Sequence, residues 1–151
     1  MKSDLDPILR ADLDRRARAL GREARRVFES GDMTSAHALQ LERLGLNQQL
    51  DDADGIATTL YEIGCLEVRV GRLTDAANHL GESFDRFQEA RRADGIAVSG
   101  YQLAVVLVQL GRAAEAVPAY AEARDAYAFL GRADRAREID ETLAAIGVGD
   151  A

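Results

Sequence analysis

Apolar residues recur along this chain at intervals of three and four, the spacing that places them on one face of an α-helix. In residues 51–90 one stripe ends at Gly71 and a second follows it. Glycine ends a helix readily because it takes a left-handed backbone conformation at little cost. The pattern predicts two helices, the second over about 73–90 with Thr74 as its N-cap. The first stripe contains Ile56, Leu60, Ile63, Leu66 and Val70, and the second contains Ala76, Ala77, Leu80, Phe84 and Phe87.

The same arrangement repeats every 40 residues. Gly31, Gly71 and Gly111 are 40 residues apart, and aligning residues 51–90 with residues 91–130 without a gap gives 12 identities in 40 positions. A fixed period of this size is typical of helical repeat proteins, whose units bury their apolar faces against one another. The pattern therefore predicts an all-α fold with units at about 11–50, 51–90 and 91–130 and a capping helix at about 132–146.

The ends of the predicted helices carry further signals. Asp6 followed by Pro7 is typical of a capping residue before a first helical proline, so the first helix is expected to begin there. Pro118 falls early in its helix, where a missing N–H costs least. Residues from Gly147 onward are expected to fray. The capping helix is expected to turn three apolar residues inward and to leave a polar outer face, the inward residues being Ile139, Leu143 and Ile146.

Composition narrows the class of protein. The 151 residues are 47% hydrophobic and 30% charged, with a formal net charge of −7, and an acidic balance disfavours binding to nucleic acid phosphates. Cys65 is the only cysteine, which excludes an internal disulfide and a cysteine-based zinc cluster. The N-terminus is too polar for a signal peptide, and no apolar run approaches the roughly 20 residues that span a bilayer. We expect one cytoplasmic domain over 1–151, with no nucleic acid and no membrane partner.

The repeated residues resemble the tetratricopeptide repeat, in which small residues let paired helices approach closely. The usual period of that family is about 34 residues, so a 40-residue period resembles its longer bacterial members. Regulatory scaffolds and the C-terminal parts of transcriptional regulators contain such members. The resemblance implies a right-handed α-solenoid. The matching residues are Leu20, Ala24, Val27 and Ala36 in the first unit, Leu60, Ile63, Gly64, Ala76 and Leu80 in the second, and Leu103, Ala104, Leu107, Ala116 and Tyr120 in the third.

In that family the first helix of each pair lines a concave groove, and the resemblance implies the same here. Tyr61 and Tyr101 occupy the same repeat position, so they are expected to form a ladder along one wall. The groove residues that the resemblance implies are Arg18, Arg25 and Phe28 in the first unit, Thr58, Tyr61, Cys65, Val68 and Arg69 in the second, Val98, Tyr101, Val105, Val108 and Gln109 in the third, and Glu138 and Glu141 in the capping helix.

The leading hypothesis is that this groove binds a protein or peptide, with no cofactor. Tyrosine suits recognition because it combines apolar area with one polar group. The alternative is that both tyrosines only pack between repeats. The charge along the groove changes from basic, at Arg18 and Arg25, to acidic, at Glu138 and Glu141, and such a gradient would orient a dipolar partner. The alternative is that these four residues are solvated surface charges without a partner. The lysines and asparagines with which the family grips a terminal carboxylate are missing from the groove positions.

Catalytic and metal-binding signals are poor, so the sequence favours a protein that is not an enzyme. His37 and His79 fall on second helices at non-equivalent repeat positions and are expected to be exposed or hydrogen-bonded structural residues. Cys65 has Glu62 and Arg69 nearby in sequence, but a lone cysteine in a helix is more often a packing residue. Three other functions stay open: a sensory module for a small effector or signalling peptide, a biosynthetic accessory protein with a ligand pocket, and a homodimer.

Overall fold

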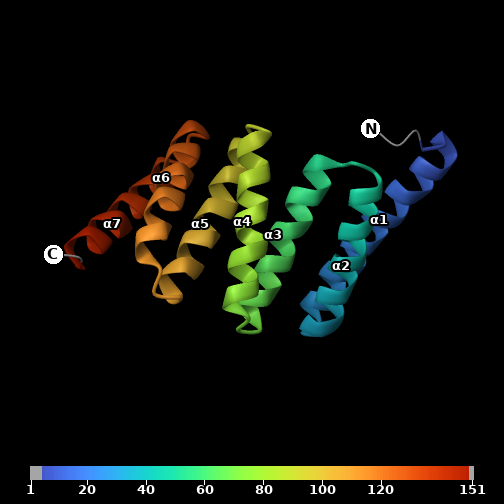
Figure 1. Ribbon diagram of the computed structural model, residues 1–151, viewed down its shortest axis with the longest axis horizontal. Helices are drawn as coiled ribbons and strands as arrows, with labels where there is room; N and C mark the ends of the chain where they lie inside the picture. The colour runs from blue at the N-terminus through green and yellow to red at the C-terminus, as the bar shows by residue number, and fades with distance from the viewer. Residues whose placement is uncertain (1–4, 150–151) are drawn as a thin grey trace.

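The computed structural model describes residues 5–149, and this part of the chain folds into seven α-helices without a strand (Figure 1). Each helix packs on the next one in sequence, so consecutive helices form pairs that stack into a helical solenoid. The predicted all-α architecture of three helix pairs and a capping helix is confirmed. The helices are α1 (Pro7–Glu29), α2 (Met33–Gln49), α3 (Ala53–Arg69), α4 (Leu73–Glu89), α5 (Ala93–Gln109), α6 (Ala113–Phe129) and α7 (Ala133–Gly149).

The helices form two layers. In Figure 1 the second helices of the pairs, α2, α4 and α6, lie in front of the first helices α1, α3 and α5. The backbones of the first helices α3 and α5 approach each other closely, whereas those of α1 and α3 stay further apart. The layer of first helices is therefore more open between the first and second units than between the second and third.

The turns share one backbone geometry, which fixes the helix ends at intervals of 20 residues. In the turn after α3, the Arg72 N–H donates to the carbonyl of Glu67 at 2.8 Å, a bond that ends the helix without a side-chain cap. Gly71 thus ends its helix as predicted. The residues with positive φ are Gly31 (92°), Asp51 (53°), Gly71 (78°), Arg91 (53°), Gly111 (76°) and Gly131 (76°).

The start of α1 matches its prediction and the start of α4 does not. The Asp6 carboxylate accepts a hydrogen bond of 2.8 Å from the N–H of Ile8, and Pro7 follows it as the first helical residue. In α4 the prediction that Thr74 is the N-cap is wrong, because the helix already begins at Leu73 and Arg72 occupies the cap position. Arg72 makes no side-chain capping bond. The backbone geometry of the preceding turn sets this helix start.

Two further expectations need correction. Pro118 is the sixth residue of α6. It therefore lies beyond the first four N–H groups that lack partners in any helix, and it removes a hydrogen bond within the helix. The capping helix α7 continues to Gly149, although fraying was expected from Gly147 onward. Residues 150 and 151 lie outside the described part of the chain.

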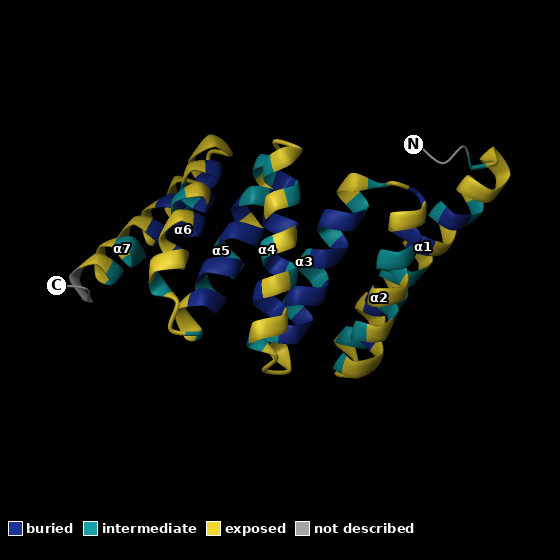
Figure 2. Cartoon of the chain, in the orientation of Figure 1, coloured by how far each residue is buried: buried dark blue, intermediate teal, exposed yellow. Residues whose placement is uncertain are grey.

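Buried apolar residues form one cluster in the C-terminal helices and another in the first unit. Buried residues also run along α3 (Figure 2), among them Leu60 and Ile63. The larger cluster runs through α4, α5, α6 and α7 and includes Leu80, Val106 and Ile139. The smaller one joins α1 and α2 through Leu13, Ala17, Leu46 and Leu50. The first unit therefore has a core of its own.

Polar contacts join the first unit to the second. The Asn47 amide donates to the Thr59 hydroxyl at 3.0 Å, and both residues are buried. Gln40 and Arg43 donate to the Glu62 carboxylate at 2.9 and 2.6 Å. Buried polar groups such as these stabilise a structure when they are paired and cost free energy when they are not. The α2–α3 junction therefore depends on side-chain hydrogen bonds more than any other junction in residues 5–149.

The carboxylate of Glu67 on α3 is almost wholly buried and lies between two histidines. Nε2 of His37, on α2, is 3.1 Å from one carboxylate oxygen, and Nδ1 of His79, on α4, is 2.7 Å from the other. The side chain of Glu67 is 3% exposed, so these two imidazoles are its hydrogen-bond partners in place of water. Both histidines are hydrogen-bonded, as expected, but their meeting at one carboxylate was not predicted.

A close approach at Gly64 fixes the packing of α3 against α4. A Cβ atom at this position would lie 2.6 Å from Cγ of Leu80, whose side chain is completely buried. The expectation that the helix pairs need a small residue here is consistent with this contact. By contrast, a Cβ atom at Gly81 would meet nothing within 4 Å.

Substitution of these two glycines is expected to have opposite effects on stability. Gly64→Leu overpacks the α3–α4 contact and should lower the free energy of unfolding by about 1–3 kcal/mol. Gly81→Leu removes a flexible residue from an open helix position and should raise it by about 0.5–1 kcal/mol. Urea unfolding followed by circular dichroism measures both changes. Equal effects of the two substitutions would contradict the close approach.

The histidine-paired carboxylate is expected to stabilise the α2–α3–α4 junction. Glu67→Ala leaves both imidazoles without their partner and should lower the free energy of unfolding by about 1–3 kcal/mol. Glu67→Gln keeps the volume and one donor and one acceptor, so its loss should be clearly smaller. Urea unfolding of the two variants provides the comparison, and wild-type stability of Glu67→Ala would show that the contacts contribute nothing.

Candidate binding pocket

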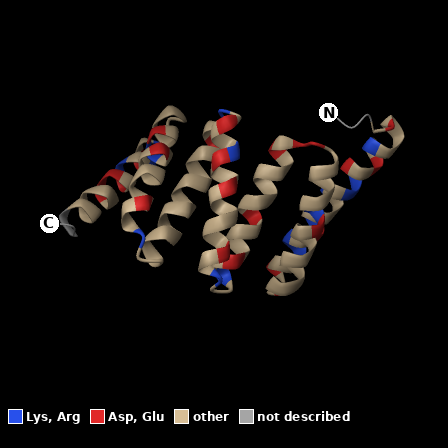
Figure 3. Ribbon diagram, in the orientation of Figure 1, with Lys and Arg blue, Asp and Glu red and all other residues tan. Residues whose placement is uncertain are grey.

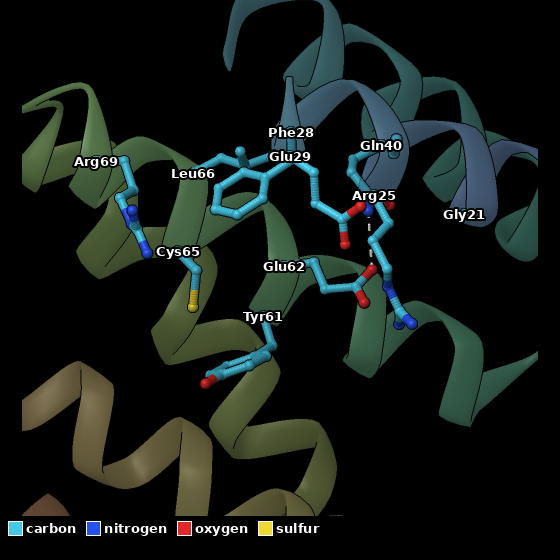
Figure 4. A pocket seen from close by; sticks show the side chains of 11 residues that line it. Gly21, Arg25, Phe28, Glu29, Gln40, Tyr61, Glu62, Cys65, Leu66 and Arg69 are labelled. Carbon is cyan, nitrogen blue, oxygen red and sulfur yellow. Dashed lines mark hydrogen bonds between the residues drawn. The ribbon is translucent and has the colours of Figure 1, made fainter. Parts of the chain in front are cut away.

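A pocket of about 310 Å³ opens between α1 and α3, where the backbones of these two helices stay apart (Figure 4). Its walls come from the first unit and from the first helix of the second unit. Figure 4 shows side chains from both helices directed toward this space. The lining residues are Gly21, Ala24, Arg25, Phe28 and Glu29 of α1, Gln40 of α2, and Tyr61, Glu62, Cys65, Leu66 and Arg69 of α3.

The 40-residue period explains why the pocket forms in the first unit. Gly21 stands at the repeat position of Tyr61 and Tyr101, so one tyrosine of the ladder is replaced by a residue without a side chain. Arg25 stands at the position of Cys65 and Val105. The first unit thus has space and a charge where the third unit has apolar side chains packed against the main cluster.

The pocket combines an apolar floor with charged walls. Arg25 and Arg69 make no ion pair with any described residue. The Arg69 guanidinium lies 5.2 Å from the centre of the Phe28 ring, close enough for a cation–π contact. The negative charge of Glu62 is engaged by Arg43 at 2.6 Å. Two cationic groups therefore remain available beside an aromatic surface.

Tyr61 and Cys65 are half-buried in the pocket and stay in their neutral forms at neutral pH. Burial raises the pKa of the Tyr61 hydroxyl above its usual range, and the Cys65 side chain adds to that rise. Burial likewise raises the pKa of the Cys65 thiol, although the Tyr61 side chain partly opposes this effect. A nucleophilic cysteine needs a lowered pKa, so the raised pKa of the Cys65 thiol argues against a nucleophilic role.

The second tyrosine of the ladder lies in a different environment. The Tyr101 ring meets Tyr120 of α6 edge to face, with 5.9 Å between ring centres. The guanidinium of Arg135, on α7, lies 4.8 Å from the centre of the Tyr101 ring and 5.6 Å from that of Tyr127. Tyr101 is thus engaged by its own chain, whereas Tyr61 borders an open pocket.

The structure brings five predicted groove residues into one pocket: Arg25, Phe28, Tyr61, Cys65 and Arg69. The others lie elsewhere. Val68 and Val105 pack partly against the main cluster, whereas Val98, Val108, Gln109 and Glu141 are exposed. Arg18 pairs with Asp14, and Glu138 pairs with Arg135, which favours solvated charges over a gradient acting on a partner. Thr58 is half-buried.

Sequence reasoning missed the lining residues Gly21, Glu29, Gln40 and Glu62. The repeat alignment holds a signal for Gly21 and Gln40, because the equivalent residues in the second unit are Tyr61 and Leu80. Where one unit has a small or polar residue and the other units have a large apolar one, the repeated core is interrupted. No such signal exists for Glu29 and Glu62, which resemble ordinary surface residues.

Comparison with known proteins does not assign this chain to a family. No family model matches the chain, and no curated protein is similar to it. Within the described residues, no cluster of three or more histidine, cysteine or acidic side chains has the geometry of a metal site. None of the helices described combines the length and the apolar character that crossing a bilayer would require.

The environment of Cys65 predicts a slow and strongly pH-dependent thiol reaction. A raised pKa lowers the thiolate fraction at any given pH, so the folded protein should react with Ellman's reagent more slowly at pH 8 than the urea-unfolded chain. Its rate should also keep rising at alkaline pH after the rate of the unfolded chain has levelled off. Since Cys65 is the only cysteine, the absorbance change reports this site alone. A folded-state midpoint at or below that of the unfolded chain would contradict the assignment.

Proposed function

We propose that this protein is a non-catalytic helical-repeat scaffold that binds a protein or peptide along the layer of its first helices. The observation that carries the proposal is the pocket between α1 and α3, which is open to solvent and has an apolar floor and unpaired arginines. The resemblance of the repeat to long-period bacterial tetratricopeptide units supports the same function, because such units are used for binding.

The surface of the first helices continues beyond the pocket. Val98 and Val108 on α5 are exposed, at 36% and 40%, although both are apolar. The two valines are ten residues apart, or nearly three helical turns, so they offer a partner two separate apolar contacts on one helix. An extended segment anchored in the pocket would pass over these valines.

A second candidate function is the binding of a small effector. Its support is the size of the pocket, because about 310 Å³ is at the lower end of the range for small-molecule sites. The exposed valines outside the pocket favour the protein or peptide partner, since a small effector would not reach them.

Photo-crosslinking from matched valines tests the scaffold proposal. A photoreactive amino acid at position 98 or 108 should crosslink to one discrete protein in cells that express this chain naturally. Positions 41 and 117, on the second helices α2 and α6, are the controls, because Leu41 and Val117 are exposed to a similar degree, 44% and 39%. Crosslinks from the control positions alone, or none from positions 98 and 108, would argue against binding along the first helices.

A further inference from the structure

We propose that the pocket between α1 and α3 takes an acidic peptide segment that carries one large apolar side chain. This inference rests on the proposed function and adds the chemistry of the partner. The pocket supplies a place for the apolar side chain, and the arginines around it supply the contacts for carboxylates on either side of that residue.

Positive charge is concentrated at the first helix of an otherwise acidic chain (Figure 3). The helix α1 contains seven arginines against four acidic residues, whereas the whole chain has a net charge of −7. Figure 3 shows basic residues along α1 and almost no charge along α5, and α2 adds Arg43. An acidic partner would therefore be attracted to the N-terminal end of the solenoid.

The charges at the pocket itself also favour an anion. Arg22 and Arg25 of α1 and Arg69 of α3 are exposed and make no ion pair with any described residue. Of the two carboxylates in the lining, Glu62 is already bound by Arg43 at 2.6 Å and by Gln40 at 2.9 Å. Only Glu29 opposes the free arginines. Arginine is well suited to this task because its planar guanidinium can bind a carboxylate through two hydrogen bonds.

A second hollow of about 400 Å³ adjoins the pocket and shares Gly21, Arg25, Glu29 and Glu62 with it. The rest of its lining is arginine, namely Arg18, Arg22, Arg26 and Arg43. Arg18, Arg26 and Arg43 each pair with a carboxylate of the chain, which leaves Arg22 and Arg25 for a ligand. The apolar pocket therefore opens directly into a basic hollow. A chain that places one residue in the first and its acidic neighbours in the second would match both surfaces.

The apolar floor sets the anchor residue. Phe28, Leu66 and Ala24 line the pocket beside Tyr61, and its volume of about 310 Å³ leaves room for one leucine or aromatic side chain. Burial of such a side chain contributes about 1.5–3 kcal/mol, whereas solvent-exposed ion pairs contribute less. The anchor would thus supply most of the affinity and the arginines most of the selectivity.

A single-stranded nucleic acid also combines a flat ring with negative charge, but the surroundings disfavour it. Nucleic acid binding needs a basic track along the phosphate backbone. No lysine or arginine lies on α5, so the basic residues at the pocket do not continue as a track along the first helices (Figure 3). An acidic peptide needs only the local cluster.

A selection from random decapeptides displayed on phage, with the full chain as the immobilised target, tests the inference. Enriched peptides should carry an excess of aspartate and glutamate around one leucine, phenylalanine or tyrosine. A labelled synthetic copy should bind the wild-type chain, and replacing its apolar residue by serine should weaken binding about tenfold or more. Enrichment of neutral or basic peptides, the absence of any enrichment, or tighter binding of a labelled poly-dT oligonucleotide would overturn the inference.

Three variants connect the binding to this pocket. Arg25→Glu with Arg69→Glu should weaken the peptide at least about tenfold, since two favourable charge contacts become repulsive. The control, Arg16→Glu with Arg137→Glu, changes the net charge equally at exposed positions outside the pocket and should leave affinity within about twofold. Gly21→Tyr installs the tyrosine found at this repeat position in the other units, so it should fill the pocket and abolish binding. Its Cβ would lie 3.0 Å from Cζ of Arg43, so that side chain must move, and circular dichroism checks that the variant is folded. Equal losses in both arginine pairs would overturn the assignment.

The outcomes separate this inference from the function on which it rests. Crosslinking of a protein from positions 98 and 108, combined with a selection that yields no acidic peptides, would remove the inference and leave the scaffold function. Acidic peptides that bind through Arg25 and Arg69, without a crosslinked protein partner, would support the inference about the pocket and argue against binding along the first helices.

Discussion

Uniform helix length is the constraint on which the rest of this structure depends. Helices α2 to α6 each contain 17 residues, because each turn places a left-handed residue at a 20-residue interval. Helices of equal length stack with their ends level, so each unit can bury its apolar stripe against the next. Residues 40 apart then occupy equivalent places in space. A side chain that departs from the repeat changes the shape of the surface at one known location.

The first unit departs from the repeat most. Its helices have a small apolar core of their own, and Asn47, Gln40 and Arg43 meet the second unit through hydrogen bonds. In the third unit, Tyr127, Tyr120 and Ala123 stand at the same three positions and are buried in the main cluster. Paired polar groups at a junction fix one relative arrangement of two units, because any other arrangement leaves donors and acceptors unpaired. The chain therefore has an apolar C-terminal part and a polar N-terminal junction.

The sequence was sufficient to predict the helix order and most helix ends, because Gly31, Gly71 and Gly111 mark turns that depend only on local backbone geometry. The same local geometry makes the N-cap at Thr74 unnecessary, which is why that prediction failed. The two histidines at Glu67 depend instead on how three helices are placed relative to each other, and the spacing of residues 37, 67 and 79 does not encode this. The pocket could be predicted only in part. Gly21 was visible as a departure from the repeat, but the opening between α1 and α3 required the packing of both helices.

The location of the pocket affects the cooperativity of folding. A repeat chain can open at a junction that depends on side-chain hydrogen bonds, so that α1 and α2 exchange their amide protons while the remaining helices stay folded. The pocket lies across that junction, with Arg25 and Phe28 on one side and Tyr61 and Arg69 on the other. A bound molecule would contact both parts and would be released when they separate. Its binding free energy would thus add to the coupling between the first unit and the rest, and occupancy would convert two folding units into one.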